Sequence, residues 1–92
     1  MTKLFRITMA QLNPTVGDIV GNADQARAAW AAGKAADADL VALPEMFLVG
    51  YQTQDLVMKP AFVADAQAHL MQLAADCADG PALTIGCPVI EE

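Results

Sequence analysis

Four consecutive apolar residues, Leu40-Val41-Ala42-Leu43, are followed at once by Pro44. An unbroken apolar run of this length, rather than an alternating one, is typical of a central parallel strand that is covered on both faces. Proline has no amide hydrogen for the strand ladder, so the strand is predicted to end at about Pro44. Parallel strands need crossover connections, usually helices, so this run predicts an α/β fold.

The residues before this run predict a strand and then a helix. Residues 4–12 alternate apolar and polar side chains, which predicts a strand, and the turn-rich residues 13–18 end it. Gly21-Asn22 offers an N-cap for an alanine-rich helix from Ala23, which Asp37-Ala38-Asp39 ends. Small side chains let such a helix lie close to a sheet, on the face formed by Ala26, Ala29, Trp30, Gly33 and Ala36.

The residues after the run predict a loop, a second helix and a third strand. The loop covers residues 45–59, and Pro60 suits the first turn of the helix. The buried stripe of this helix is expected to consist of Val63, Ala66, Leu70, Leu73 and Cys77. Gly80-Pro81 then precedes a strand at 82–90. The order is β-α-β-α-β, with right-handed crossovers between parallel neighbours; a mixed sheet is the alternative, because the third strand could pair in several ways.

Composition narrows the classes of function. Hydrophobic residues make up 55% of the 92 residues, more than a chain of this size is expected to bury alone, so a partner surface is predicted. The net charge is −6 and the five basic residues are scattered, which argues against a nucleic-acid partner. The sequence has no Cys/His cluster, so a structural zinc site is not expected. No apolar stretch reaches the roughly 18–20 residues of a membrane span. Without signal-peptide features, a cytoplasmic location with reduced thiols is expected.

Glu45 is the candidate catalytic residue. Parallel α/β sheets bind ligands beyond the carboxyl ends of their strands, and Glu45 directly follows one such end. At the rim of a buried sheet its carboxylate would be partly desolvated, and desolvation raises a carboxylate pKa toward values useful for a general base. The alternative is a structural role, in which Glu45 caps the loop or pairs with a lysine.

Two stretches carry a resemblance to a known family. Residues 42–51, which contain Pro44-Glu45 and Gly50-Tyr51, resemble the first conserved pattern of the nitrilase, or carbon–nitrogen hydrolase, superfamily. Residues 9–19, followed by Gly21-Asn22, are also similar to it. Residues 13–18 together with 55–62 resemble more narrowly the glutaminase domain of bacterial glutamine-dependent NAD synthetases. The resemblance implies that residues 1–92 are an N-terminal segment of that domain and form the β-α-β-α-β portion of an αββα sandwich.

The resemblance also implies a mechanism. Family members use a Glu–Lys–Cys triad, in which cysteine attacks an amide carbon and forms a thioester. Glu45 matches the glutamate, the general base, and Tyr51 matches a tyrosine that lies near the substrate in glutamine-using members. Ammonia released from glutamine would serve the amidation of deamido-NAD by a separate domain that uses ATP and Mg²⁺. No phosphate-binding glycine motif is present here, so no cofactor is expected in this segment.

The remaining reactive side chains are interpreted as structural. The family's lysine and cysteine come later in sequence, and their roles are not transferred to residues present here. Cys77 and Cys87 are interpreted as small core residues, Lys59 as exposed, and His69 as a solvated or packing histidine.

The sequence leaves three hypotheses. The first is a segment of a glutamine-dependent NAD synthetase that is inactive alone, with glutamine as the substrate of the parent enzyme. The second is part of another amidase of the superfamily. The third is a non-catalytic module that works by association. As a segment of the family fold, the chain is expected to be of low stability alone, and to self-associate or to be completed by the missing remainder of the domain.

Overall fold

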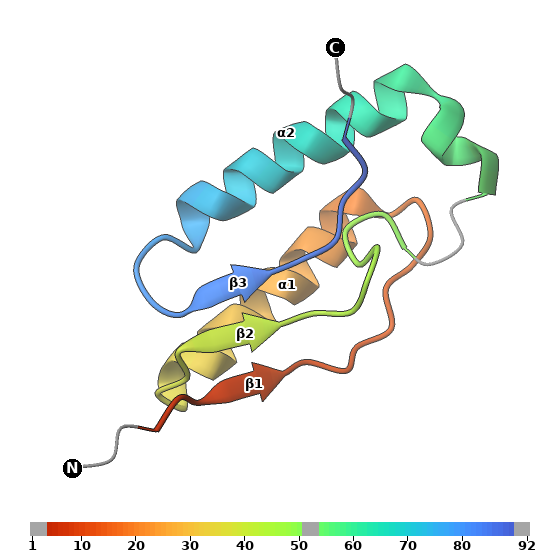
Figure 1. Ribbon diagram of the computed structural model, residues 1–92. Coiled ribbons are helices and arrows are strands. Elements are labelled where there is room, and N and C mark those ends of the chain that lie inside the picture. Colours follow the sequence, from red (N-terminus) through yellow and green to blue (C-terminus); the bar gives the residue numbers. More distant parts are fainter. Residues whose placement is uncertain (1–3, 51–53, 90–92) are drawn as a thin grey trace.

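The computed structural model of the chain describes residues 4–50 and 54–89 (Figure 1). The predicted alternation of strands and helices is confirmed. A short 3₁₀ helix lies within the segment that was predicted to be a loop. In chain order the elements are β1 (Ile7–Met9), α1 (Ile19–Ala35), β2 (Leu40–Ala42), η1 (Gln54–Met58), α2 (Pro60–Asp76) and β3 (Ala82–Thr84).

The three strands form one sheet in which β2 lies between β1 and β3, and both pairs are parallel. The mixed-sheet alternative is therefore wrong for these strands. Each strand is three residues long, shorter than predicted. The physical reason is Pro44: the Leu43 amide still donates a hydrogen bond to the Thr84 carbonyl at 3.0 Å, but the chain then turns away and leaves β1 and β3 without a central partner.

Both helices lie on the same side of this sheet and pack against each other (Figure 1). A side chain at Gly33 of α1 would collide with Val41 and come close to Thr8, so these two residues face the helix. Ile7 and Met9 point to the opposite face, where they are 53% and 71% exposed. The prediction that β2 is covered on both faces is thus met on one face only, because no described element covers the other.

Helix α1 begins earlier than predicted. Asp18 is the N-cap, and its carboxylate accepts a hydrogen bond from the Gly21 amide at 3.0 Å. The prediction of a cap at Gly21-Asn22 is wrong, since Asp18 caps as well as Asn does and frees Asn22 for a buried position. Ala26 and Gly33 are buried as predicted, whereas Ala36 is the exposed C-cap.

Helix α2 begins at Pro60, as predicted from the missing amide hydrogen of proline. Val63, Ala66 and Leu73 are its buried residues, and Leu70 and Cys77 are partly buried against the same core. Arg27 of α1 and Asp76 of α2 form an ion pair of 2.8 Å across the two helices. The two helices therefore cover the side of the core that faces away from the sheet.

The centre of the core comes from a turn rather than from a strand. Phe47, Leu48 and Val49 come soon after β2 and are fully buried. They pack with Ile19 and with small residues of both helices. The segment after Glu45 is thus one of the most enclosed parts of the molecule.

Candidate functional site

Glu45 begins the turn at the carboxyl end of β2, where the sequence predicted a site. The prediction that its carboxylate is partly desolvated is wrong for the described residues: Glu45 is exposed, because none of them covers that edge of the sheet. Within residues 4–50 and 54–89 the basic members of the ion pairs are Arg27, Lys34 and His69, and none of them pairs with Glu45. The carboxylate is therefore open to solvent in the part of the chain that the structure describes.

A cavity of about 230 Å³ adjoins this position. Its lining comes from the segments that leave β1 and β2, and it ends at Pro44, the residue before Glu45. The lining residues are Met9, Ala10, Gln11, Ala42, Leu43 and Pro44. The lining is mostly apolar, and Glu45 follows its last residue, Pro44, directly in sequence.

The turn that carries Glu45 is fixed by Asn22, a residue that sequence reasoning treated as a cap. The Asn22 Oδ1 accepts a hydrogen bond from the Thr15 amide at 2.8 Å. Its Nδ2 donates to the carbonyl oxygens of Thr15, at 2.8 Å, and of Leu48, at 3.0 Å. The Gly17 amide also donates to the Val49 carbonyl at 2.9 Å. One feature of the sequence could have indicated this role. Asn22 comes four residues after the N-cap Asp18 and lies on the buried face of the helix.

Two glycines allow the surrounding backbone to come close to this turn. Gly50 has φ +92°, and a Cβ there would lie 2.7 Å from the Val16 backbone nitrogen. A Cβ on Gly86 would collide with the Met46 backbone nitrogen. Met46 itself has φ +58°, an unusual conformation for a non-glycine residue. Such strain persists where the surroundings over-determine the backbone, and it lies here beside Glu45.

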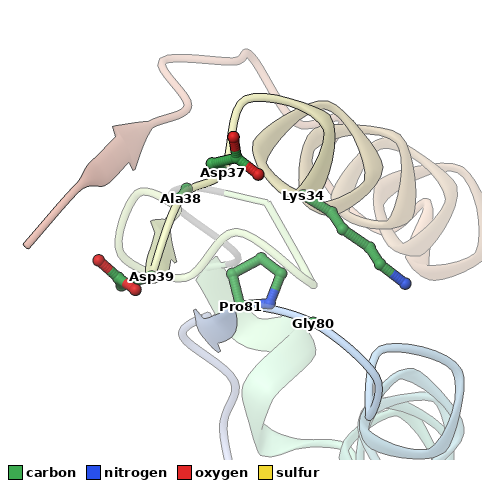
Figure 2. Close-up of a pocket in the computed structure, with 6 residues that line it drawn as sticks. All are labelled: Lys34, Asp37, Ala38, Asp39, Gly80 and Pro81. Atoms are coloured by element: carbon green, nitrogen blue, oxygen red, sulfur yellow. The ribbon is translucent and has the colours of Figure 1, made fainter.

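A larger cavity, of about 350 Å³, lies at the opposite end of the strands (Figure 2). Asp37, Asp39 and Lys34 line it together with Ala38, Gly80 and Pro81. Figure 2 shows that the Lys34 side chain extends away from Asp37 and Asp39, so the charged groups do not converge. The Lys34 ammonium instead lies over the Trp30 ring and 3.7 Å from the Asp79 carboxylate.

The thiols in this segment have the properties of core residues. Cys77 and Cys87 are partly buried, and burial raises the pKa of both thiols above the ordinary 9.0. At Cys77 the charge of Arg27 partly opposes this shift of the pKa. A raised pKa keeps sulfur in the unreactive thiol form, whereas a catalytic cysteine needs a thiolate. This agrees with the structural interpretation of both residues.

The other predicted residues lie on or beside α2, or outside the described residues. His69 lies on α2, where Nδ1 contacts the Asp65 carbonyl at 3.0 Å, and Lys59 is exposed at the start of that helix. In the described part of the chain, no three His, Cys, Asp or Glu side chains gather as metal ligands would. Tyr51, the predicted substrate-binding residue, lies outside the described residues. Within residues 4–50 and 54–89, neither α-helix is long and apolar enough to cross a membrane.

Comparison with known proteins decides the family. The carbon–nitrogen hydrolase family profile matches residues 6–91. The chain belongs to the carbon–nitrogen hydrolase family. A glutamine-dependent NAD(+) synthetase of Rhodobacter capsulatus is 67% identical over 92 residues, which are all of this chain and 17% of that protein. The chain thus spans about a sixth of the length of this relative.

Solved structures of other proteins share the fold. A glutamine-dependent NAD(+) synthetase from Cytophaga hutchinsonii superposes with a TM-score of 0.87 at 28% identity, over 95% of this chain and 15% of that one. An amidase from Nesterenkonia sp. superposes with a TM-score of 0.78, also at 28% identity, over 95% of this chain and 33% of that one. The predicted fold class, a β-α-β-α-β portion of the nitrilase fold, is confirmed, while the catalytic role of Glu45 stays a prediction.

Proposed function

We propose that the chain is a segment of the glutaminase domain of a glutamine-dependent NAD synthetase, and that Glu45 is a general base in that domain. The position of Glu45 carries the proposal: it directly follows Pro44 at the carboxyl edge of the sheet, beside a mostly apolar cavity. The identity of 67% with the Rhodobacter capsulatus synthetase supports glutamine as the substrate.

In the proposed reaction, Glu45 accepts the proton of a cysteine thiol as the sulfur attacks the side-chain amide carbon of glutamine. Glu45 passes this proton to the leaving nitrogen as the carbon–nitrogen bond breaks, so that ammonia leaves and a thioester remains. The carboxylate of Glu45 then accepts a proton from the water that attacks the thioester, and it returns this proton to the cysteine sulfur as glutamate is released. A lysine stabilises the negative charge of the tetrahedral intermediates. The cysteine and the lysine belong to the family pattern beyond these residues, so the 92 residues alone would not hydrolyse glutamine.

The proposed parent enzyme acts in the cytoplasm. There a synthetase domain uses the released ammonia, with ATP and Mg²⁺, to amidate deamido-NAD. Within the 92 residues no cofactor is proposed, and neither nucleic acid nor a membrane is a proposed partner.

The exposed side of the sheet supports a partner surface. Ile7 and Met9 are more than half exposed there, and burial of apolar area is worth about 25 cal/mol per Å². The remainder of the hydrolase domain would cover this face, and without it the chain would associate with other copies. Size-exclusion chromatography with light scattering tests this, and a stable monomer at micromolar concentration would contradict it.

The function is tested in a chimeric synthetase, in which these 92 residues replace the matching segment of the Rhodobacter capsulatus relative. We expect Glu45→Gln to reduce glutamine-dependent NAD formation by about 10²–10⁴-fold, the usual contribution of general acid–base catalysis. Synthesis from added ammonium bypasses the glutaminase and should be unchanged. Both rates are measured by NAD production at saturating ATP.

Asp37→Asn is the matched control, since it removes an exposed carboxylate at the other end of β2. It should leave both rates within about twofold, the small effect usual for a surface change. Equal losses in the two variants, or full glutamine-dependent activity in Glu45→Gln, would sink the assignment of Glu45. A parent chimera that uses ammonium but not glutamine would count against the glutaminase itself.

The likeness to the Nesterenkonia amidase favours a second candidate, a free-standing amidase of the same family. The two candidates differ in the reading frame beyond residue 92. A synthetase carries an ATP-dependent domain after the hydrolase, and an amidase ends with the hydrolase. Sequencing the adjoining reading frame separates them.

A further inference from the structure

Asn22 is the one fully buried polar side chain among the described residues, and it joins three parts of the chain. It belongs to the first turns of α1, yet all its side-chain hydrogen bonds leave the helix. One acceptor and two donor contacts connect it to Thr15, before the helix, and to Leu48, 26 positions later. Replacing this buried amide is costly, because the Leu48 carbonyl that would lose its partner is fully buried.

The Leu48 residue is held from both sides. Its carbonyl accepts from the Asn22 Nδ2 at 3.0 Å, and its amide donates to the Gly86 carbonyl at 3.3 Å. Asn22 belongs to the helix after β1, while Gly86 belongs to the segment after β3. The backbone three residues beyond Glu45 is therefore fixed by elements on both sides of β2.

This anchor lies in the turn that Glu45 begins. The turn from Glu45 closes when the Gly50 amide donates to the Met46 carbonyl at 2.9 Å, with Met46 in its left-handed conformation. Within such a tight turn the direction of the first residue depends on the position of the rest. If Leu48 moved, Met46 could relax its φ and turn the Glu45 Cα–Cβ bond.

We propose that Asn22 is a positioning residue for Glu45: its amide holds the Leu48 backbone and thereby aims the carboxylate at the reacting thiol. This deepens the proposed function and rests on it. Asn22 acts through the backbone and has no contact with substrate. An amide is suited to the role because one group supplies the donors for two carbonyls and the acceptor for an amide, without adding a charge.

The test uses Asn22→Ala in the chimeric synthetase. We expect kcat for glutamine to fall by about 10–100-fold, as for a catalytic group displaced by about 1 Å, with KM within about twofold. Asn22→Asp is the second variant, since it keeps the shape and the acceptor oxygen but loses both donors. In Asn22→Asp, too, kcat should fall while KM stays within about twofold.

Asp18→Ala is the matched control, because it weakens the same end of α1 without any contact to Leu48. It should leave kcat unchanged, and ammonium-dependent synthesis should be unchanged in all three variants. A double-mutant cycle separates positioning from general structural damage: if Asn22 acts through Glu45, Asn22→Ala should cost little more in a Glu45→Gln background.

Three outcomes would overturn the proposal. In the first, the loss of kcat in the double variant equals the product of the losses in Asn22→Ala and Glu45→Gln. In the second, kcat falls in Asp18→Ala as much as in Asn22→Ala. The third is loss of ammonium-dependent synthesis in both Asn22 variants, which would assign Asn22 to folding alone. These differ from failure of the proposed function, in which the unmodified chimera or the Glu45→Gln comparison fails before Asn22 is changed.

Discussion

The two ends of β2 are each closed by a non-glycine residue with positive φ, and the two turns are held in different ways. At the amino end, Asp37 has φ +61° and is exposed. Its amide donates to the Lys34 carbonyl at 3.1 Å, and the Ala38 amide donates to the Gly33 carbonyl at 2.9 Å. These are the two hydrogen bonds of a Schellman motif, which any helix end can make from neighbouring residues.

The carboxyl end depends on distant residues instead. Met46 has φ +58°, nearly the same as Asp37, but its turn is fixed by Asn22 of α1, by the segment around Gly17 and by Gly86 after β3. The same backbone conformation is thus held by local contacts at one end of the strand and by tertiary contacts at the other. The difference teaches that the strained backbone at the Glu45 end is maintained by contacts from distant parts of the fold. The strained backbone at the Asp37 end is maintained by hydrogen bonds to neighbouring residues, so its cost in stability is that of one residue.

The largest effect is expected from Gly50→Ala. The added methyl would meet the backbone of Val16, and the φ of +92° is unfavourable for alanine. Neither obstacle can be relieved by a side-chain rotation, so a loss of about 2–4 kcal/mol is expected. In the chimeric synthetase, the temperature of half-inactivation of glutamine-dependent activity should fall by roughly 5–10 °C.

Gly80→Ala at the other end serves as the comparison. There the added methyl would meet the Trp30 ring and the Lys34 side chain, at 3.1 Å from its Cδ. Only side-chain atoms stand in the way there, whereas Gly50→Ala meets backbone atoms and also has the unfavourable φ, so the loss should be smaller than for Gly50→Ala. Equal losses at the two positions would break the contrast between a local and a tertiary turn.

This contrast also separates what the sequence could predict from what it could not. The end of α1 at Asp37-Ala38-Asp39, the start of α2 at Pro60 and the strand before Pro44 were all predicted, because each depends on neighbouring residues. The role of Asn22 was missed, since its partner Leu48 is 26 positions away and no local pattern reports that contact. Likewise, the exposure of Ile7 and Met9 depends on which elements cover the sheet, which periodicity does not reveal.

Cys87 provides a probe of the carboxyl end, because it follows Gly86, whose carbonyl accepts from the Leu48 amide. Burial raises the pKa of its thiol, so at pH 8 it should be alkylated several-fold more slowly than a free thiol. This difference in the alkylation rate should disappear as the pH rises through the raised pKa of Cys87. Because the folded state favours the protonated thiol, this contribution to stability is complete below the ordinary pKa of 9.0 and is lost as the pH rises through the raised pKa.

Gly50→Ala should speed the alkylation of Cys87, while Cys77 at the end of α2 should react at its original rate and serve as the internal control. Peptide mass mapping after timed exposure to iodoacetamide distinguishes the two thiols. Equal acceleration at both would indicate global loosening, and the carboxyl end would then not be a separately fixed unit.

The smallest effect is expected from Asp37→Gly. Glycine removes the Cβ strain of the left-handed conformation, but it also adds freedom to the unfolded chain, so a net gain of no more than about 0.5–1 kcal/mol is expected. Asp37→Ala should lose a similar amount, since alanine tolerates this φ less well than aspartate does. Asp37→Asn removes the charge at the helix C-terminus and keeps the backbone preference, so it isolates the electrostatic part. If Asp37→Ala were as damaging as Gly50→Ala, the amino-end turn would also depend on tertiary contacts, and the two ends of β2 would not differ in kind.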